Sequence, residues 1–226
     1  MNEVRTSEGH YSIPVIEKIL NTNDQLAQEN TSRLDALGVR AISIMAAPGG
    51  GKTSLILRTI EALRGQRRIG VIEGDIASQV DSRRIADVAA VPVVQINTGG
   101  QCHLDANMIR GALGHLPLAE IDLLLIENVG NLVCPVAFRL GEHRRVAITS
   151  VPEGGDKPYK YPAIFQAVEA VVINKLDLLP YVDFNVDAFH ALVLALNPDV
   201  ALFDVSCKTG EGIEEWAAWL SEKDVG

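Results

Sequence analysis

The sequence predicts an α/β protein with a mostly parallel sheet and helices on both of its faces. Seven short runs rich in Val and Ile alternate with segments whose apolar residues recur at helical spacing. Runs that are apolar almost throughout are typical of strands buried on both sides, as parallel strands are. A glycine-rich loop also joins the first run to the next helix, which is how many phosphate-binding α/β sheets begin.

The first 38 residues predict a helical extension in front of this sheet. Between Pro14 and Leu37, apolar residues fall mostly three, four or seven apart, and Gly38 follows where helices commonly stop. We expect residues 1–38 to pack on one domain formed by residues 39–226, because amphipathic helices usually bury their apolar stripe. The alternative is that part of this stripe serves a dimer interface.

The remaining elements follow from the alternation. The predicted strands are Val39–Ala47, Ile69–Ile72, Pro92–Ile96, Leu123–Val129, Val146–Val151, Val171–Ile173 and Val200–Val205. The predicted helices are Thr53–Leu63, Ser78–Val88, Ala106–Leu116, Ala163–Val168, Val186–Leu196 and Ile213–Leu220. Ligands of such sheets bind beyond the carboxyl ends of the strands, and every motif below falls at such an end.

Composition narrows the class of protein. The chain has 226 residues, 47% of them hydrophobic, which argues for one folded domain rather than disorder. Its formal charge of −9 argues against a nucleic-acid binder, and no apolar stretch of about 18 residues predicts a membrane span. Met1–Glu17 lacks the apolar core of a signal peptide, so we expect a cytoplasmic protein. Three scattered cysteines are too few for a disulfide framework and favour metal binding or burial.

The loop after the first predicted strand reads A-A-P-G-G-G-K-T from Ala46 to Thr53. It matches the P-loop pattern G-x-x-x-x-G-K-S/T except that Ala46, at the strand end, replaces the first glycine, and its strand–loop–helix context predicts a P-loop NTPase. Backbone N–H groups and the helix start would hold phosphate, Lys52 would neutralise it, and the Thr53 hydroxyl would hold Mg²⁺. The residues expected to bind the nucleotide here are Pro48, Gly49, Gly50, Gly51, Lys52, Thr53 and Ser54.

Two further strand ends predict guanine as the base. The residues from Asn174 to Asp177 read N-K-x-D, and the Asp177 carboxylate would accept two hydrogen bonds that guanine offers and adenine does not. The S-C-K sequence from Ser206 to Lys208 resembles the S-A-K element of GTPases. N-K-x-D alone is a weak signal, but the order of the three motifs predicts a G domain that binds GTP. The residues expected to hold the base are Asn174, Lys175, Asp177, Ser206, Cys207 and Lys208.

Acidic residues at two strand ends predict a magnesium site and a switch. Asp75 would hold Mg²⁺ directly or through water, although it could instead cap the following helix. Glu127 begins E-x-x-G where common GTPases carry D-x-x-G, so it would contact the Mg²⁺ shell while Gly130 senses the γ-phosphate. We expect Lys52, Thr53, Asp75 and Glu127 to serve catalysis. Because no catalytic glutamine or arginine finger is evident, we expect slow hydrolysis used as a switch.

Two cysteines and a histidine predict a second metal site. Cys102 and His103 follow the third predicted strand, and Cys134 lies four residues after Gly130. We expect these side chains to converge, because both loops lie at functional strand ends. Two thiolates and an imidazole suit Zn²⁺ or Ni²⁺, and three ligands leave one position open. The alternative is that the cysteines are merely buried beside a satisfied histidine.

The segments N-T-G-G-Q-C-H-L-D-A from Asn97 and E-N-V-G-N-L-V-C-P from Glu127 closely resemble the HypB family, hydrogenase nickel-incorporation GTPases of the SIMIBI class. The resemblance runs from about Pro14 to Leu220. It implies that Cys102, His103 and Cys134 form a nickel or zinc site at a subunit interface. It further implies a GTP-promoted homodimer that works with a second, nickel-exchanging maturation protein and with the hydrogenase large-subunit precursor.

Other interpretations stay open. The urease accessory GTPase family UreG shares the P-loop and N-K-x-D. It places Cys-Pro-His in the loop that here carries Cys102 and His103, and it lacks the E-N-V-G-N-L-V-C-P segment, so HypB fits better. A metal-independent regulatory GTPase would not need the three ligands, and a P-loop kinase would need an acceptor pocket that no segment suggests. Some HypB members carry an N-terminal cysteine-rich nickel motif or histidine-rich tract, whereas Met1–Ser12 offers only His10. We therefore expect nickel to be received from elsewhere or held briefly.

Overall fold

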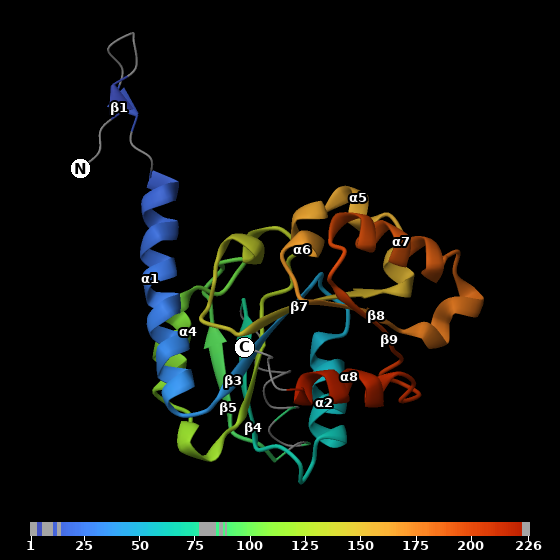
Figure 1. Cartoon of the computed structure of the whole chain (residues 1–226), viewed down its shortest axis with the longest axis horizontal. Helices are drawn as coiled ribbons and strands as arrows, with labels where there is room; N and C mark the ends of the chain where they lie inside the picture. The colour runs from blue at the N-terminus through green and yellow to red at the C-terminus, as the bar shows by residue number, and fades with distance from the viewer. Residues whose placement is uncertain are drawn as a thin grey trace.

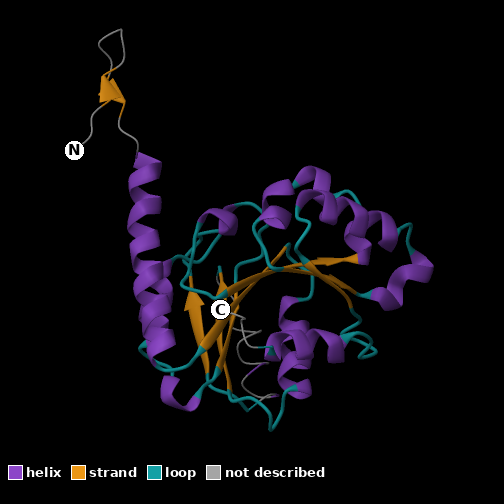
Figure 2. Ribbon diagram, viewed as in Figure 1, coloured by secondary structure: helices purple, strands orange, loops and turns teal. Residues whose placement is uncertain are grey.

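A seven-stranded sheet forms the centre of the protein, and helices cover both of its faces (Figure 1, Figure 2). The computed structural model describes residues 4–5, 11–12, 15–76, 85, 88 and 90–222. The predicted helix Ser78–Val88 falls almost entirely outside these ranges, and His10 also lies outside them. Every pairing within the large sheet is parallel, so the fold class predicted from the sequence is confirmed.

All seven predicted strands are present, with ends that differ by a few residues. They are β3 (Arg40–Ala46), β4 (Ile69–Asp75), β5 (Val93–Asn97), β6 (Leu123–Glu127), β7 (Arg144–Ser150), β8 (Ala170–Asn174) and β9 (Ala201–Asp204). Their order across the sheet is β5-β4-β6-β3-β7-β8-β9. Strand β4 continues beyond its predicted end at Ile72, because Glu73 to Asp75 still pair in register with β5. A separate antiparallel pair, β1 (Val4–Arg5) and β2 (Tyr11–Ser12), was not predicted.

The helices also follow the predicted order. They are α1 (Val15–Ala36), α2 (Lys52–Ala62), α4 (Ala106–Leu113), α5 (Lys157–Lys160), α6 (Pro162–Gln166), α7 (Val186–Leu196) and α8 (Ile213–Ser221). Short 3-10 turns, which were not predicted, occur at η1 (Leu118–Glu120), η2 (Cys134–Ala137), η3 (Val151–Glu153) and η4 (Leu176–Tyr181). Helix α4 ends before the predicted Leu116, because the chain turns at Gly114. No helix within the described residues is long and apolar enough to span a membrane.

Side-chain alternation along the strands divides the core between the two faces of the sheet. Ile42 and Ile44 of β3 pack with α2 and α8, whereas Ala41 packs with α1 and α4 and Met45 with α6 and α7. These four β3 side chains are fully buried, as expected for a central parallel strand. The fold therefore presents one continuous carboxyl edge, where the loops carrying the predicted site residues lie.

Two asparagines attach α1 to the rest of the protein, alongside α4 (Figure 1). Asn30 is buried, and its Nδ2 donates to the carbonyl oxygens of Ala106 and Leu140, both at 2.9 Å. Asn23, two helical turns earlier, donates to the Arg139 carbonyl at 2.8 Å and accepts from the Ala106 N–H at 2.9 Å. Because residues seven apart share a helix face, α1 presents both amides to the loop after β6 and to the start of α4.

We predict that Asn30→Ala lowers the free energy of unfolding by about 1–3 kcal/mol, because it leaves two buried carbonyls without this donor. Chemical denaturation followed by circular dichroism measures the loss. Thr22→Ala, an exposed change on the same helix, is the matched control and should shift stability by less than about 0.5 kcal/mol. Equal effects of the two substitutions would show that α1 does not depend on the Asn30 contacts.

Candidate functional site

The phosphate loop lies between β3 and α2 and requires glycine at two backbone positions. Gly49 and Gly51 have φ values of 78° and 99°, in the region that side chains disfavour. A Cβ atom on Gly51 would also lie 2.3 Å from Nδ2 of Asn174. Helix α2 starts at Lys52, directly after this turn, so its free N–H groups and positive dipole end face the loop. This arrangement is suited to binding a phosphate anion.

The predicted magnesium ligands are Thr53, in the first turn of α2, and Asp75, at the end of β4, and Glu127 lies at the end of β6. The Thr53 hydroxyl donates to Oε1 of Glu127 at 2.9 Å, and Nζ of Lys52 lies 4.0 Å from the same oxygen. Glu127 is 3% exposed, and Asp75 ends the neighbouring strand two residues beyond Glu73, the register partner of Glu127. A hydroxyl and carboxylates are the hard oxygen ligands that Mg²⁺ prefers, so the donor set fits this ion. The predicted helix Ser78–Val88, which Asp75 would otherwise cap, falls almost entirely outside the described residues.

The loop after β6 touches the phosphate loop at the predicted γ-phosphate sensor. A Cβ atom on Gly130 would lie 3.1 Å from the backbone nitrogen and Cγ of Pro48. Only a residue without a side chain therefore fits this approach without movement of its neighbour. The loop that carries Cys134 thus starts in contact with the nucleotide-binding loop.

The N-K-x-D loop and the S-C-K loop line one pocket of about 700 Å³ together with the phosphate loop and α2. Asn174 donates from Nδ2 to the Gly50 carbonyl at 3.2 Å, and its Oδ1 accepts from the Cys207 N–H at 3.2 Å. Nζ of Lys175 donates to the Gly49 carbonyl at 2.7 Å. Asn174 therefore connects the N-K-x-D loop to both the phosphate loop and the S-C-K loop.

Asp177 lines this pocket as an ionised acceptor. The Ser206 hydroxyl donates to its Oδ1 at 2.7 Å, and Nζ of Lys208 lies 3.6 Å from its Oδ2. The hydrogen bond from Ser206 and the nearby charge of Lys208 both lower the pKa of the Asp177 carboxyl below its usual value. The group is therefore a carboxylate at neutral pH, which accepts hydrogen bonds and donates none.

Arg58 of α2 also holds the S-C-K loop, a contact that sequence reasoning missed. Its Nε donates to the Cys207 carbonyl at 2.6 Å, and Nη2 donates to the Lys208 carbonyl at 3.1 Å. Burial raises the pKa of the Cys207 thiol to about 11, so this cysteine is a neutral thiol at physiological pH. Cys207 also lines the base-binding pocket.

Cys102, His103 and Cys134 converge as the sequence predicts. Their ligand atoms all lie within 4.8 Å of one another, and Sγ of Cys102 is 3.8 Å from Nδ1 of His103. All three side chains are half-buried, which leaves the cluster accessible from one side. Two sulfurs and an imidazole nitrogen in this arrangement fit Zn²⁺ or Ni²⁺ better than the oxygen-seeking Mg²⁺.

Protonation at this cluster follows from the proximity of its members. A hydrogen bond with Cys134, together with burial, raises the pKa of the Cys102 thiol. Burial lowers the pKa of His103, so its imidazole is neutral at physiological pH and has a lone pair available for a metal ion. Metal binding through the Cys102 sulfur must therefore release the proton of this thiol.

Two asparagines in the loop after β6 organise the cluster, and their contacts were not predicted. Oδ1 of the buried Asn128 accepts from the backbone N–H of Leu104 at 3.1 Å, which joins this loop to the loop of Cys102 and His103. Oδ1 of Asn131 accepts from the backbone N–H of Cys134 at 3.4 Å. Both residues stand in the segment E-N-V-G-N-L-V-C-P, where Asn131 bonds within its own loop, whereas the bond from Leu104 to Asn128 depends on tertiary structure.

Comparisons with known proteins match most of the chain. Residues 40–204 match the family model described as CobW/HypB/UreG, nucleotide-binding domain. The chain is 50% identical over 207 residues to the hydrogenase maturation factor HypB of Azotobacter vinelandii, covering 92% of this chain and 68% of that protein.

Solved structures of this family also resemble the protein. The crystal structure of HypB from Archaeoglobus fulgidus has a TM-score of 0.82 at 42% identity, over 88% of this chain and 97% of that one. HypB from Helicobacter pylori, crystallised in complex with nickel, has a TM-score of 0.83 at 36% identity, over 88% and 93% of the two chains. The resemblance extends across most of both molecules.

The contacts of Asp177 generate a test of base specificity. We predict that Asp177→Asn weakens GTP binding about 10- to 100-fold and favours xanthosine triphosphate, because the new amide donates to the xanthine oxygen where the carboxylate could only accept. Competition binding with GTP, xanthosine triphosphate and ATP measures the change. The guanine assignment fails if the unmodified protein binds ATP as tightly as GTP.

Proposed function

Because the chain belongs to the CobW/HypB/UreG nucleotide-binding family and is a HypB homologue, we propose that it is a GTPase that inserts nickel during hydrogenase maturation. In this proposal GTP binding controls a metal site formed by Cys102, His103 and Cys134. The family supports a GTPase activity in general, and HypB from Helicobacter pylori was crystallised in complex with nickel. Zinc is a second candidate metal, because the same donors suit it.

A continuous set of contacts between the two sites carries the proposal. The Thr53 hydroxyl bonds to Glu127 at the end of β6, and the next residue, Asn128, bonds through its side chain to the N–H of Leu104. Leu104 directly follows His103. If Glu127 moves when nucleotide binds, the loop that carries Cys102 and His103 would therefore move with it.

The phosphate end of the nucleotide would be held by the backbone and by charge. N–H groups of the glycine loop and the start of α2 bind the phosphates, and Lys52 neutralises their outer oxygens. Mg²⁺, held by the Thr53 hydroxyl and by Asp75 or Glu127, would supply positive charge to the phosphates when bound. Because no catalytic glutamine or arginine is assigned, the proposed hydrolysis is slow and serves as a timer for the metal site.

Partners enter the proposal through the metal site. Three ligands leave one coordination position for water, a partner or a second copy of the chain, and the half-buried cluster is open to such contact. The partners that we propose are a second copy of the chain in a GTP-promoted homodimer, a second maturation protein that exchanges nickel, and the hydrogenase large-subunit precursor. The cytoplasmic location expected from the sequence also stays a prediction.

GTP hydrolysis tests the nucleotide half of the proposal. Lys52→Ala should remove most GTP affinity or turnover, because the phosphates lose the cation that faces them, while the unfolding transition stays near that of the unmodified protein. Phosphate release under single-turnover conditions measures this, with Lys18→Ala on α1 as the control. Unchanged turnover in Lys52→Ala would contradict the P-loop assignment.

Metal titration tests the other half. Cys102→Ala and Cys134→Ala should lose Ni²⁺ and Zn²⁺ binding but retain GTP, whereas Cys207→Ala, a cysteine substitution outside the cluster, should retain metal binding. Affinity should fall as pH falls, because protons compete for thiols and the pKa of Cys102 is raised. Because the pKa of His103 is lowered, protons compete with the metal for its imidazole nitrogen only in more acidic solution. Full metal binding by the Cys102/Cys134 double variant would favour a metal-independent GTPase.

A further inference from the structure

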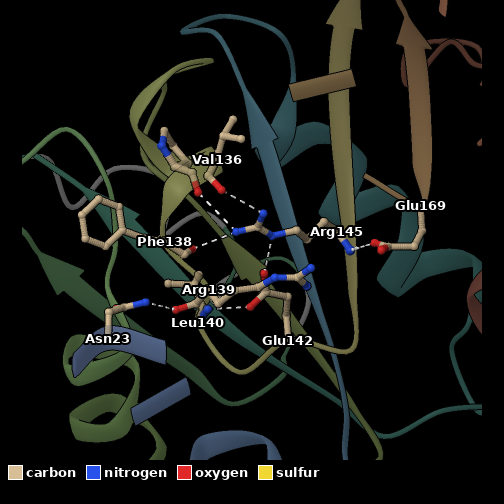
Figure 3. A network of polar contacts seen from close by, with 9 residues as sticks. Asn23, Val136, Phe138, Arg139, Leu140, Glu142, Arg145 and Glu169 are labelled. Carbon is tan, nitrogen blue, oxygen red and sulfur yellow. Dashed lines mark hydrogen bonds and ion pairs between the residues drawn. The ribbon is translucent and has the colours of Figure 1, made fainter. Parts of the chain in front are cut away.

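Behind the metal loop lies a buried arginine that the nucleotide site does not use. The side chain of Arg145, on β7, is 3% exposed, and that of its partner Glu142 is 0% exposed. Nε of Arg145 donates to Oε1 of Glu142 at 2.5 Å (Figure 3). Burying two charges is costly unless their hydrogen-bonding groups are satisfied. The remaining donors of Arg145 must therefore find acceptors in the protein.

The other donors of the guanidinium bind the segment that follows Cys134. Nη1 donates to the Val136 carbonyl at 3.0 Å, and Nη2 donates to the Phe138 carbonyl at 2.9 Å and to the Pro135 carbonyl at 3.4 Å. Two of these carbonyls belong to η2, the 3-10 turn whose first residue is Cys134. A planar guanidinium directs its donors in a fixed fork, so one side chain sets three carbonyls relative to β7.

The held segment also contacts the histidine of the cluster. The rings of Phe138 and His103 are stacked, with centroids 3.9 Å apart and an interplanar angle of 25°. On its far side the segment is held by α1, because Asn23 donates to the carbonyl of Arg139, the residue after Phe138 (Figure 3). The segment fixed by Arg145 therefore carries one proposed metal ligand and packs against another.

A second set of contacts keeps Arg145 itself in place. Oε2 of Glu142 accepts from the Leu140 N–H at 2.6 Å, and the backbone N–H of Arg145 donates to Oε2 of Glu169 at 2.6 Å. Both ends of the arginine are thus anchored, the side chain by Glu142 and the main chain by β7 and Glu169. A residue held at both ends is suited to fixing the position of the segment that it binds.

We infer that Arg145 is a positioning residue for the metal site, which holds Cys134 and Phe138 so that the three donors converge before metal arrives. This inference rests on the proposed metal site. Lysine cannot replace it, because a single ammonium group pairs with Glu142 but cannot reach three carbonyls in the geometry of a fork. Groups that orient metal ligands from behind typically change metal affinity about 10- to 100-fold when replaced.

Two variants test the inference while guarding the fold. Arg145→Lys keeps the positive charge beside Glu142, and the double variant Arg145→Met with Glu142→Gln removes both charges at similar volume. Each should lower Ni²⁺ and Zn²⁺ affinity about 10- to 100-fold by calorimetry and alter the visible spectrum of bound Co²⁺, with GTP affinity unchanged. Arg67→Met is the matched control, because Arg67 also donates to a carbonyl, that of Ser221, at the amino edge of the sheet.

A metal-free measurement separates this inference from the proposed function. Diamide takes up two hydrogens as it oxidises a pair of thiols to a disulfide, so the rate of Cys102–Cys134 disulfide formation, read by peptide mapping, reports the approach of these sulfurs. The rate should fall in both Arg145 variants and stay unchanged in Arg67→Met. If the unmodified protein binds no metal, the proposed function fails. The rate of disulfide formation still tests whether Arg145 positions the two sulfurs. Variants that bind GTP and match the unmodified protein in metal affinity, Co²⁺ spectrum and oxidation rate would overturn the inference.

Discussion

The hydrogen bond from the Leu104 N–H to the Asn128 side chain joins the two halves of the candidate site. Its importance follows from the geometry at the end of β6, where successive side chains point to opposite faces of a sheet. Glu127 faces α2 and accepts from Thr53, whereas Asn128 turns toward the loop before α4. Two adjacent residues therefore serve the nucleotide site and the metal loop from one buried strand. A strand packed on both faces resists deformation, so movement at one of these side chains is expected to affect the other.

Close packing at the carboxyl edge makes this arrangement sensitive to the nucleotide. Gly51 has no room for a side chain because Asn174 lies against it, and Gly130 is limited in the same way by Pro48. The base loop, the phosphate loop and the loop after β6 therefore touch through positions that only glycine fills without displacement. The cluster of Cys102, His103 and Cys134 is half-buried and more open. Nucleotide binding would thus act on a tightly packed region, and the metal ligands lie at its accessible border.

Much of this architecture follows from local sequence. Continuous apolar runs such as that of β3 predict a buried parallel strand, and the phosphate loop is recognised because three glycines and Lys52 fall between a strand and a helix. The convergence of Cys102, His103 and Cys134 was predicted from loops at one edge of the sheet, although the strands before them, β5 and β6, were wrongly expected to be adjacent and are separated by β4. The convergence is confirmed by the positions of their ligand atoms, while the binding of a metal stays a prediction. Motifs at strand ends are readable because parallel topology brings those ends together.

What the sequence did not predict depends on contacts between distant segments. Nothing in local spacing shows that the buried Arg145 reaches the carbonyls after Cys134, or that Asn30 bonds across to Leu140. The continuation of β4 to Asp75 was missed for the same reason, because a glycine and two acids look like a loop until β5 pairs with them. A polar residue that binds a distant backbone group creates no repeating pattern in the sequence, because it needs only one partner at one position. The sequence therefore does not predict such contacts.

Metal affinity measured in three nucleotide states tests the proposed coupling most directly. Ni²⁺ and, separately, Zn²⁺ would be titrated by calorimetry into the empty protein, the GDP-loaded protein and the protein loaded with a non-hydrolysable GTP analogue. The account predicts that affinity differs between states by about 5- to 150-fold, and that metal shifts nucleotide affinity by the same factor. Equal metal affinity in all three states would contradict it.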